Sequence, residues 1–274
     1  MRYCVNVWGS EAPVTYLDAI VAHHRLRARS DDRSERDLRS LTSNLPPARG
    51  FAHALREASR NAMAVIAEIK RRSPSKGVLL ADLNPAAVAG DYERGGAACL
   101  SVLTDEPHFG GSARDLNLAR SATRLPVLRK DFTVSRRDVY DARLMEADCV
   151  LLIAAVLSES ELVDYAGTAR EIGMDALVEI HSEDDIPRAV AAGTKLIGVN
   201  QRDLVTFAVD HGRAVRVGAS LPSDVVRVAE SGVRSGADSA ALRAAGYHAV
   251  LVGESLVTAT NRGDLLADLR CAVP

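Results

Sequence analysis

The sequence predicts an α/β protein whose single domain, residues 1–274, is a (β/α)8 barrel: a closed parallel sheet surrounded by helices. Eight short apolar runs occur between residues 64 and 252, and roughly 15 to 30 residues, mostly helix-like, separate one run from the next. Strand, helix and strand at this interval form the βα unit of a parallel sheet. Eight such units in 274 residues fit a closed barrel. No GxGxxG sequence follows the first run, which disfavours an open dinucleotide-binding sheet.

The chain before the first run predicts an irregular lead followed by helices. Thr15 and Asp18 have the spacing of a helix cap. Charges of both signs between residues 25 and 37 predict a solvated helix face rather than a nucleic-acid-binding surface. Pro46 and Pro47 interrupt the chain, and a short helix is expected over residues 51–58. Apolar residues spaced as on one face of the first helix are Leu17, Ile20, Val21 and Leu26.

The eight apolar runs predict the strands. Side chains alternate between the two faces of a strand, so Val65, Ala67 and Ile69 should meet a covering apolar layer. Glu68 and Lys70 then take the opposite face, where buried charges are expensive unless they are paired or needed. The predicted strands are Ala64–Lys70, Ala98–Leu103, Pro126–Arg129, Cys149–Ile153, Ala176–Ile180, Leu196–Val199, Val225–Ala229 and Ala249–Val252.

Polar residues gather where these strands end. In a (β/α)8 barrel the carboxyl ends of all eight strands meet at one face, and chemistry takes place there. A loop-facing or capping role would explain each polar residue alone, but three glutamates, two lysines and an amide together predict a catalytic rim. These six residues are Glu68, Lys70, Lys130, Glu179, Asn200 and Glu230, and Ser231 follows directly after Glu230.

Glycines after the seventh and eighth strands predict a phosphate site. Gly232 and Gly253 permit close backbone approach, and short backbone nests and helix N-termini can collect an anion there. Ser73 and Lys70 could add side-chain donors from the first strand. Glu254 would offer its backbone N–H and turn its carboxylate away from the anion. The alternative is that both glycines only make turns.

The composition excludes several classes of function. A formal net charge of -2 and an aromatic content of 4% give no reason to expect nucleic acid or an acidic membrane surface as a partner. Four cysteines, Cys4, Cys99, Cys149 and Cys271, lie far apart, and no metal site is visible at ligand spacing. No segment has the length of a signal peptide or a membrane span. We therefore expect a cytoplasmic protein without a metal.

Taken together, these segments closely resemble the indole-3-glycerol phosphate synthase family. The matching segments are AVIAEIKRRSPSKG, VLTDEPHFGGS, PVLRKDF, VLLIAAVLS, ALVEIH, IGVNQRDL, VAESGV and VLVGESL, in the family's order. The resemblance implies a (β/α)8 TIM barrel with an N-terminal helical extension, residues 1–60, over the active-site mouth. It implies a carboxy-lyase of tryptophan biosynthesis that needs no cofactor, and a monomer.

The implied substrate is a small phosphosugar, 1-(2-carboxyphenylamino)-1-deoxyribulose 5-phosphate. Ring closure, decarboxylation and dehydration convert it into indole-3-glycerol phosphate, carbon dioxide and water. Ring closure develops negative charge on a carbonyl oxygen, which needs a cation or an acid beside it. Dehydration needs an acid and a base together.

The resemblance also implies a role for each site residue. Lys130 is the general acid, Glu179 the base, Lys70 an assisting acid, and Glu68 the partner that orients the lysines. The sequence does not decide which lysine donates at which step. The remaining residues bind substrate: Asn200, Glu230 and Ser231 its hydroxyls, Leu103, Phe109, Phe132 and Leu151 the anthranilate ring, and Arg202 the carboxylate.

Other hypotheses remain open at this point. An aldolase that uses Lys130 as a Schiff-base nucleophile would share the fold. A non-catalytic subunit would be expected to lack Lys130 or Glu179, and both are present. A third alternative is a related enzyme that makes indole compounds for a purpose other than the synthesis of tryptophan. Gln201 stands where the family often has a second asparagine.

Overall fold

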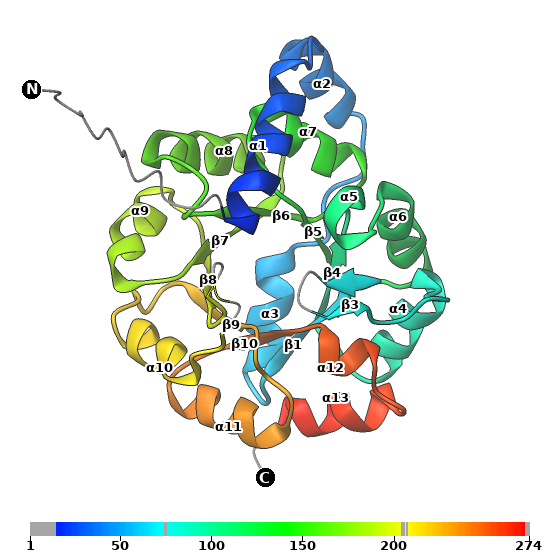
Figure 1. Ribbon diagram of the computed structural model, residues 1–274, viewed down its shortest axis with the longest axis vertical. Helices are drawn as coiled ribbons and strands as arrows, with labels where there is room; N and C mark the ends of the chain where they lie inside the picture. Colours follow the sequence, from blue (N-terminus) through cyan, green and yellow to red (C-terminus); the bar gives the residue numbers. More distant parts are fainter. Residues whose placement is uncertain (1–14, 74–75, 204–205, 207, 272–274) are drawn as a thin grey trace, which may run out of the picture.

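The protein folds into a closed barrel of eight parallel strands, as the sequence predicts (Figure 1). The computed structural model describes residues 15–271, apart from 74–75, 204–205 and 207. Cys4 and the lead segment before residue 15 lie outside the described residues. The strands follow one another around the barrel in chain order, and the last strand pairs with the first. Parallel strands joined in this order bring all their carboxyl ends to one face.

The observed strands agree with the predicted runs to within one residue at each end. A two-stranded antiparallel hairpin, β2 (Arg72–Ser73) and β3 (Gly77–Val78), follows the first barrel strand. The barrel strands are β1 (Ala64–Ile69), β4 (Cys99–Leu103), β5 (Val127–Lys130), β6 (Cys149–Ile153), β7 (Asp175–Ile180), β8 (Leu196–Asn200), β9 (Val226–Glu230) and β10 (Ala249–Val252).

Helices form a ring outside the barrel (Figure 1). The ring consists of α4 (Pro85–Arg94), α6 (Ala113–Ala122), α7 (Arg136–Leu144), α8 (Glu159–Glu171), α9 (Ile186–Ala191), α10 (His211–Ala219), α11 (Gly236–Ala244) and α13 (Arg262–Arg270). Short turns of helix, α5 (Glu106–Phe109), η1 (Glu183–Asp185) and α12 (Glu254–Val257), follow β4, β7 and β10. Among the described residues, no helix is both long and apolar enough to cross a membrane.

The barrel has two separate apolar cores, as strand alternation predicts. Val65, Ala67 and Ile69 pack in the outer core between strands and helices. Leu128 and Leu177 pack in the inner core, inside the barrel. Because side chains two residues further along a strand share its face, Lys130 and Glu179 also point into the barrel.

The N-terminal segment contributes helices to both ends of the barrel. The helix α3 (Phe51–Ser59) inserts Phe51 and Leu55 into the inner core, beside the residues that begin the strands. The backbone N–H of Ala52 donates to Asp175 at the start of β7, with an N–O distance of 2.9 Å. All of residues 1–60 were expected to cover the mouth. The helix α3 instead lies at the opposite end of the barrel, which its apolar face closes.

The first helix, α1 (Tyr16–Arg29), begins with the capping box expected of Thr15 and Asp18. Its buried residues are Ile20 and His24. Leu26, expected on the apolar face, is 68% exposed, so that prediction was wrong. A position four residues after Ile20 lies on the same helix face, and here His24 occupies it.

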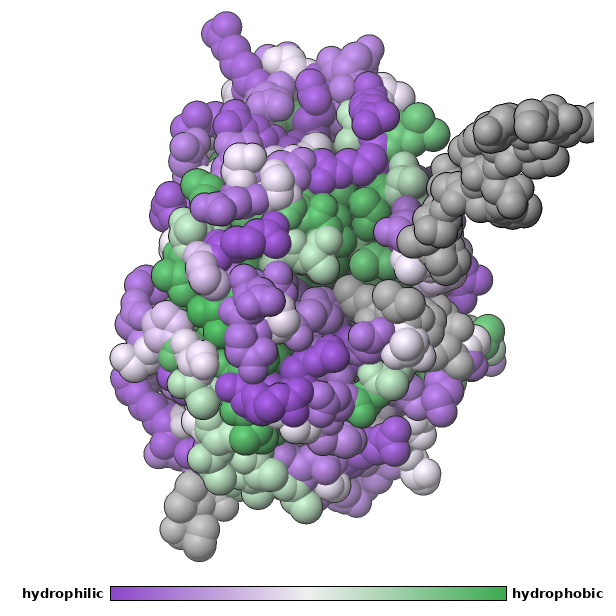
Figure 2. Space-filling view, turned by 60° about the vertical axis from the view of Figure 1, so that its left-hand side comes forward, coloured by the Kyte–Doolittle hydropathy of each residue, from purple (hydrophilic) through white to green (hydrophobic). Residues whose placement is uncertain are grey.

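The mixed charges after residue 24 bind neighbouring helices rather than only facing solvent. Arg25 forms an ion pair with Glu161 of α8, and Arg33 binds Asp141 of α7 with 2.8 Å between Nη1 and Oδ1. The helix α2 (Glu35–Thr42) also packs against α7. Hydrophilic residues cover much of the surface shown in Figure 2, and a hydrophobic stretch crosses its upper middle.

Candidate active site

A cavity of about 330 Å³ opens at the carboxyl ends of the strands. Residues from all eight barrel strands or the loops after them line it, so distant parts of the chain meet there as the sequence predicts. All of the candidate site residues line this cavity: Glu68, Lys70, Ser73, Leu103, Phe109, Lys130, Phe132, Leu151, Glu179, Asn200, Arg202, Glu230, Ser231, Gly232, Gly253 and Glu254. Their common location is established, and their roles remain predictions.

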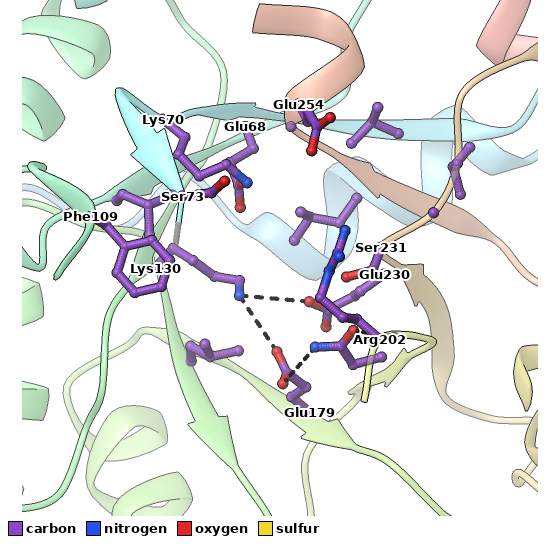
Figure 3. Close-up of a pocket in the computed structure, with 18 of the residues that line it drawn as sticks. Glu68, Lys70, Ser73, Phe109, Lys130, Glu179, Arg202, Glu230, Ser231 and Glu254 are labelled. Carbon is purple, nitrogen blue, oxygen red and sulfur yellow. Dashed lines mark hydrogen bonds and ion pairs between the residues drawn. The ribbon is translucent and has the colours of Figure 1, made fainter. Parts of the chain in front are cut away.

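Lys130 ends β5, and its ammonium group points between two buried glutamates (Figure 3). Its Nζ lies 3.5 Å from Oε2 of Glu179 and 3.9 Å from Oε2 of Glu230. Burial lowers the pKa of Lys130, but the carboxyl groups of Glu179, Glu230 and Glu68 outweigh burial and hold this pKa above its usual value. Lys130 is therefore a cation at neutral pH and can donate a proton.

Glu179 and Glu230 are both buried, but their pKa values shift in opposite directions. Burial raises the pKa of Glu179, yet Lys130 and the neighbouring His181 and Asn200 hold it below its usual value. The Asn200 amide donates to Oε1 of Glu179 at 3.1 Å. Burial and the charge of Glu179 raise the pKa of Glu230 well above its usual value. Glu230 therefore holds its proton to a higher pH than Glu179 does.

Glu68 and Lys70 form a second charged pair, on β1 and just after it. Nζ of Lys70 lies 2.6 Å from Oε1 of Glu68. Burial raises the pKa of Glu68, but Lys70 and Lys130 outweigh burial and keep this pKa below its usual value. Glu68 is therefore ionised and balances part of the positive charge of the two lysines.

Two glycines make room for these carboxyl groups. A Cβ atom on Gly198 of β8 would lie 2.1 Å from Oε1 of Glu230, closer than atoms can approach. A Cβ on Gly253 would lie 2.3 Å from Oε1 of Glu68. The sequence analysis predicted a role for Gly253, the close approach of its backbone to an anion. It predicted none for Gly198, because no local sequence pattern shows that a glycine in one strand faces a side chain of the next strand.

The loops after β9, β10 and β1 line adjacent parts of the cavity, because these strands are neighbours in the barrel. Ser231 and Gly232 have φ angles of 66° and 81°, in the left-handed region that serine rarely adopts. Gln201 supports this turn, since its side-chain amide donates to the carbonyl oxygen of Ser231 at 2.8 Å. The buried Oγ of Ser73 has no hydrogen-bond partner among the described residues.

Residues of β4 and β6, together with residues that follow β4 and β5, make the other side of the cavity apolar. Leu103, Phe109, Phe132 and Leu151 lie there. The ring centroids of Phe109 and Phe132 are 6.4 Å apart, with an angle of 37° between the planes. The apolar side begins next to the polar side, where β4 pairs with β1, and continues around the barrel through β5 to β6.

The cavity also contains residues that the sequence analysis missed. Leu17 of α1 and Asp105 after β4 line it, as do Arg234 in the loop after β9 and Ser255 in α12. Arg234 and Ser255 lie two residues beyond Gly232 and Gly253, so the same strand-end rule could have identified them. Leu17 belongs to a helix outside the βα pattern, and no strand-end rule could have identified it.

Histidine and aspartate side chains meet at one edge of the mouth. His24, Asp105 and His108 each place a nitrogen or oxygen within 4.8 Å of the others, which is close enough for a metal ion. Both histidines already contact Asp105, at 2.8 Å for His24 Nε2 and 3.0 Å for His108 Nδ1. We therefore treat the cluster as a hydrogen-bonded network.

Solved structures with similar folds are other barrels. The chain aligns with a 3-hexulose-6-phosphate synthase at a TM-score of 0.60 and 15% identity, covering 77% of this chain and all of the other. A thiamine phosphate pyrophosphorylase from Pyrococcus furiosus aligns with a TM-score of 0.56 at 14% identity, covering 76% and 93%. Identities this low show the fold alone.

Sequence relatives are much closer. A protein of Desulfosudis oleivorans named indole-3-glycerol phosphate synthase is 46% identical over 236 residues, 86% of this chain and 90% of its own. Proteins of the same name from Chloroherpeton thalassium and Chlorobium chlorochromatii are 44% and 40% identical, covering 89% and 92% of this chain and 95% and 99% of theirs. The family model described as indole-3-glycerol phosphate synthase matches residues 17–269. The chain belongs to the indole-3-glycerol phosphate synthase family, the carboxy-lyases of tryptophan biosynthesis.

Proposed function

We propose that this enzyme makes indole-3-glycerol phosphate by general acid–base catalysis, with Lys130 as the acid and Glu179 as the base. The observation that carries the proposal is the position of Lys130: a partly buried cation 3.5 Å from Glu179, inside a cavity with one apolar and one polar side. The substrate has the matching order of parts, with a carboxyphenyl ring at one end, a phosphate at the other and the reacting carbonyl between.

The first step is closure of the new ring. The ring carbon that carries the carboxylate attacks the C2 carbonyl carbon, and the carbonyl oxygen becomes negative as the new bond forms. Lys130 is proposed to stabilise this oxygen and give it a proton, which makes it a hydroxyl group. Loss of carbon dioxide then leaves its bonding electron pair in the ring and restores aromaticity.

The last step removes water. Glu179, held by Asn200 at 3.1 Å, is proposed to take a proton from the carbon next to the one that carries the hydroxyl group. The electrons of the broken C–H bond form the C=C bond of the indole, and the hydroxyl group departs as water with a proton from a lysine. Lys70 is proposed to assist as an acid, and Glu68 to orient it through their 2.6 Å contact.

Other residues are proposed to hold the substrate in place. Phe109 and Phe132, with Leu103 and Leu151, are proposed to flank the ring, and Arg202 to bind the carboxylate. On the opposite side, Ser231 and Glu230 would bind hydroxyl groups. Leu17 lines the same cavity, which supports a covering role for α1.

The proposed phosphate site predicts competition by inorganic phosphate. Phosphate should raise the apparent KM without lowering kcat, because it would bind beside Ser73, Gly232, Gly253 and the Glu254 backbone. A hydrogen bond to a charged group is worth about 1.5–3 kcal/mol, so Ser73→Ala should raise the inhibition constant at least about tenfold. Steady-state inhibition measures both effects.

The matched control is Ser59→Ala at the opposite end of the barrel, where Ser59 Oγ donates to the Arg56 carbonyl oxygen. Its inhibition constant should equal that of the wild type. Non-competitive inhibition, or equal inhibition of wild type and Ser73→Ala, would contradict the placement of the phosphate.

Gly198→Ala tests whether the space at β8 matters for Glu230. The added methyl group overlaps Oε1 of Glu230 and must displace it. Overpacking of this kind costs about 1–3 kcal/mol, so we expect kcat to fall about tenfold with the circular dichroism spectrum retained. Gly167→Ala in α8, where the new Cβ would come no closer than 3.9 Å to Arg170, is the control and should be unchanged. Unchanged kcat in Gly198→Ala would show that Glu230 can move without consequence.

The proposal as a whole is tested by adding the carboxyphenylamino sugar phosphate and following indole fluorescence. We expect product formation with release of carbon dioxide and no adduct on Lys130 after borohydride treatment. An adduct would favour the Schiff-base alternative, and absence of product would refute the proposed function.

We also propose that the enzyme is a cytoplasmic monomer. One chain supplies residues from all eight barrel strands to the cavity, so the site needs no second subunit. Cys99 and Cys149 are buried free thiols, which is compatible with a reducing compartment.

A further inference from the structure

His24 is the buried polar contact between α1 and the mouth of the barrel. Its side chain is 3% exposed, and its Nε2 lies 2.8 Å from Oδ2 of Asp105 and 3.9 Å from Oδ1 of Asp131. Burial raises the pKa of Asp105, but the hydrogen bonds from His24 and His108 outweigh it and hold the pKa below its usual value. An ionised carboxylate can only accept, so Nε2 of His24 carries the donated proton.

Asp105 connects His24 to Phe109, which lies on the apolar side of the cavity. Its Oδ1 accepts the backbone N–H groups of His108 and Phe109, at 2.7 and 3.2 Å, and so caps α5. The position of Phe109 therefore depends on a carboxylate whose other oxygen is held by His24.

His24 also supports the second aromatic wall directly. Its ring centroid lies 5.3 Å from that of Phe132, with an angle of 36° between the planes. Leu17 is seven residues earlier on the same face of α1 and lines the cavity. One side chain thus joins the helix at the mouth to both phenylalanines.

We propose that His24 is a positioning residue for the aromatic end of the substrate. It holds α1, Phe109 and Phe132 in the arrangement that receives the carboxyphenyl ring. This inference rests on the proposed function, in which those phenylalanines flank the ring. His24 is not among the residues that line the cavity, and the acid–base groups lie deeper in the barrel.

The expected signature is a change in KM rather than in kcat. Without the hydrogen bond, only a fraction of the molecules has the wall and the helix assembled, and the apparent dissociation constant rises by the inverse of that fraction. Once substrate is bound, the wall is assembled and Lys130 and Glu179 act as before. We expect His24→Leu to raise KM about tenfold with kcat within about threefold of wild type.

Two further variants separate positioning from general packing. His24→Gln keeps an N–H donor near the position of Nε2 and should restore most of the wild-type KM. His53→Leu changes an exposed histidine of α3, at the opposite end of the barrel, and should leave KM unchanged. An unchanged KM in His24→Leu, a fall in kcat alone, or equal defects in the leucine and glutamine variants would overturn the proposal.

A readout without substrate keeps this inference separate from the proposed function. Trypsin cleavage at Arg25, Arg27 and Arg29 of α1 reports whether the helix is docked. His24→Leu should be cut about tenfold faster than wild type, and His24→Gln nearly as slowly as wild type. Equal cleavage rates would overturn the role of His24 in docking even if synthase activity is present. A wild type without synthase activity but with the predicted cleavage pattern would instead refute the proposed function.

Discussion

Replacing Lys130 with methionine is expected to lower kcat by roughly two to four orders of magnitude, the contribution typical of general acid catalysis. Methionine has similar length and volume but offers no proton and no positive charge. The carbonyl oxygen would then become negative without a cation or an acid beside it. The measurement is the steady-state rate of indole fluorescence at saturating substrate, with circular dichroism to confirm the fold.

The loss of Lys130 also changes the charges of its neighbours. Its ammonium lies 3.5 Å from Glu179, and the positive charge offsets part of the rise in pKa that burial causes in this carboxyl group. Without the ammonium, the pKa of Glu179 should rise, because burial and the neighbouring Glu230 then act with less opposition. The acid and the base are therefore electrostatically coupled, and a double variant of both should lose less than the product of the single losses.

A matched lysine serves as the control for this experiment. Lys195 precedes β8 and forms an ion pair with Asp224 at 2.9 Å, and its side chain is 60% exposed. Lys195→Met should leave kcat and KM unchanged, since surface ion pairs contribute little. Near-normal turnover in folded Lys130→Met would rule out the acid role.

The positions of these side chains could be predicted because two rules suffice, and both can be applied to each strand separately. Alternation along a strand placed Glu68, Lys130 and Glu179 on the inward face of their strands, and the structure confirms this. The rule that parallel strands end at one face then brings residues more than a hundred positions apart to one cavity. Neither rule requires knowledge of which strands are neighbours.

Features that depend on contacts between distant segments were not predictable. His24 looks like one of several polar residues in a charged helix, and only the fold shows that it meets Asp105, 81 residues later. For the same reason Leu26 was expected on the buried face, and the whole extension of residues 1–60, which includes α3, was expected over the mouth. Apolar spacing indicates which face of a helix is buried, but not which end of the barrel receives it.

The opposite pKa shifts of Glu179 and Glu230 are another feature that only the structure reveals. In the sequence, both are glutamates near the ends of apolar strands. In the barrel both carboxyl groups lie close to the ammonium of Lys130, and Asn200 donates a hydrogen bond to Glu179. Glu179 is thereby held ionised, and its charge helps to keep the proton on Glu230. Two carboxyl groups in one site often separate into a base and an acid in this way.

Glutamine variants of the two residues should therefore differ sharply. Glu179→Gln removes the ionised base and should lower kcat by roughly two to four orders of magnitude. Glu230→Gln replaces a neutral carboxylic acid with a neutral amide of the same shape, and kcat should fall no more than about tenfold. Measured side by side, equal large losses would show that Glu230 also acts as a charged group, and equal small losses would remove Glu179 from the base role.

The pH dependence of unfolding gives an independent check on these protonation states. A carboxyl group whose pKa is raised in the folded protein stabilises the fold fully below its unfolded pKa, about 4.3, and loses this contribution as the pH rises through the folded value. Relative to wild type, Glu230→Gln should therefore become more stable between pH 5 and pH 8, as measured by urea unfolding. Glu179, whose folded pKa is lowered, contributes its full stability above pH 5 and loses it only in stronger acid. Glu179→Gln also removes the charge that helps to raise the pKa of Glu230, so its deficit relative to wild type should shrink between pH 5 and pH 8. The change should be smaller than in Glu230→Gln, because burial still raises the pKa of Glu230. A larger change with pH in Glu179→Gln than in Glu230→Gln would mean that Glu179 carries the proton.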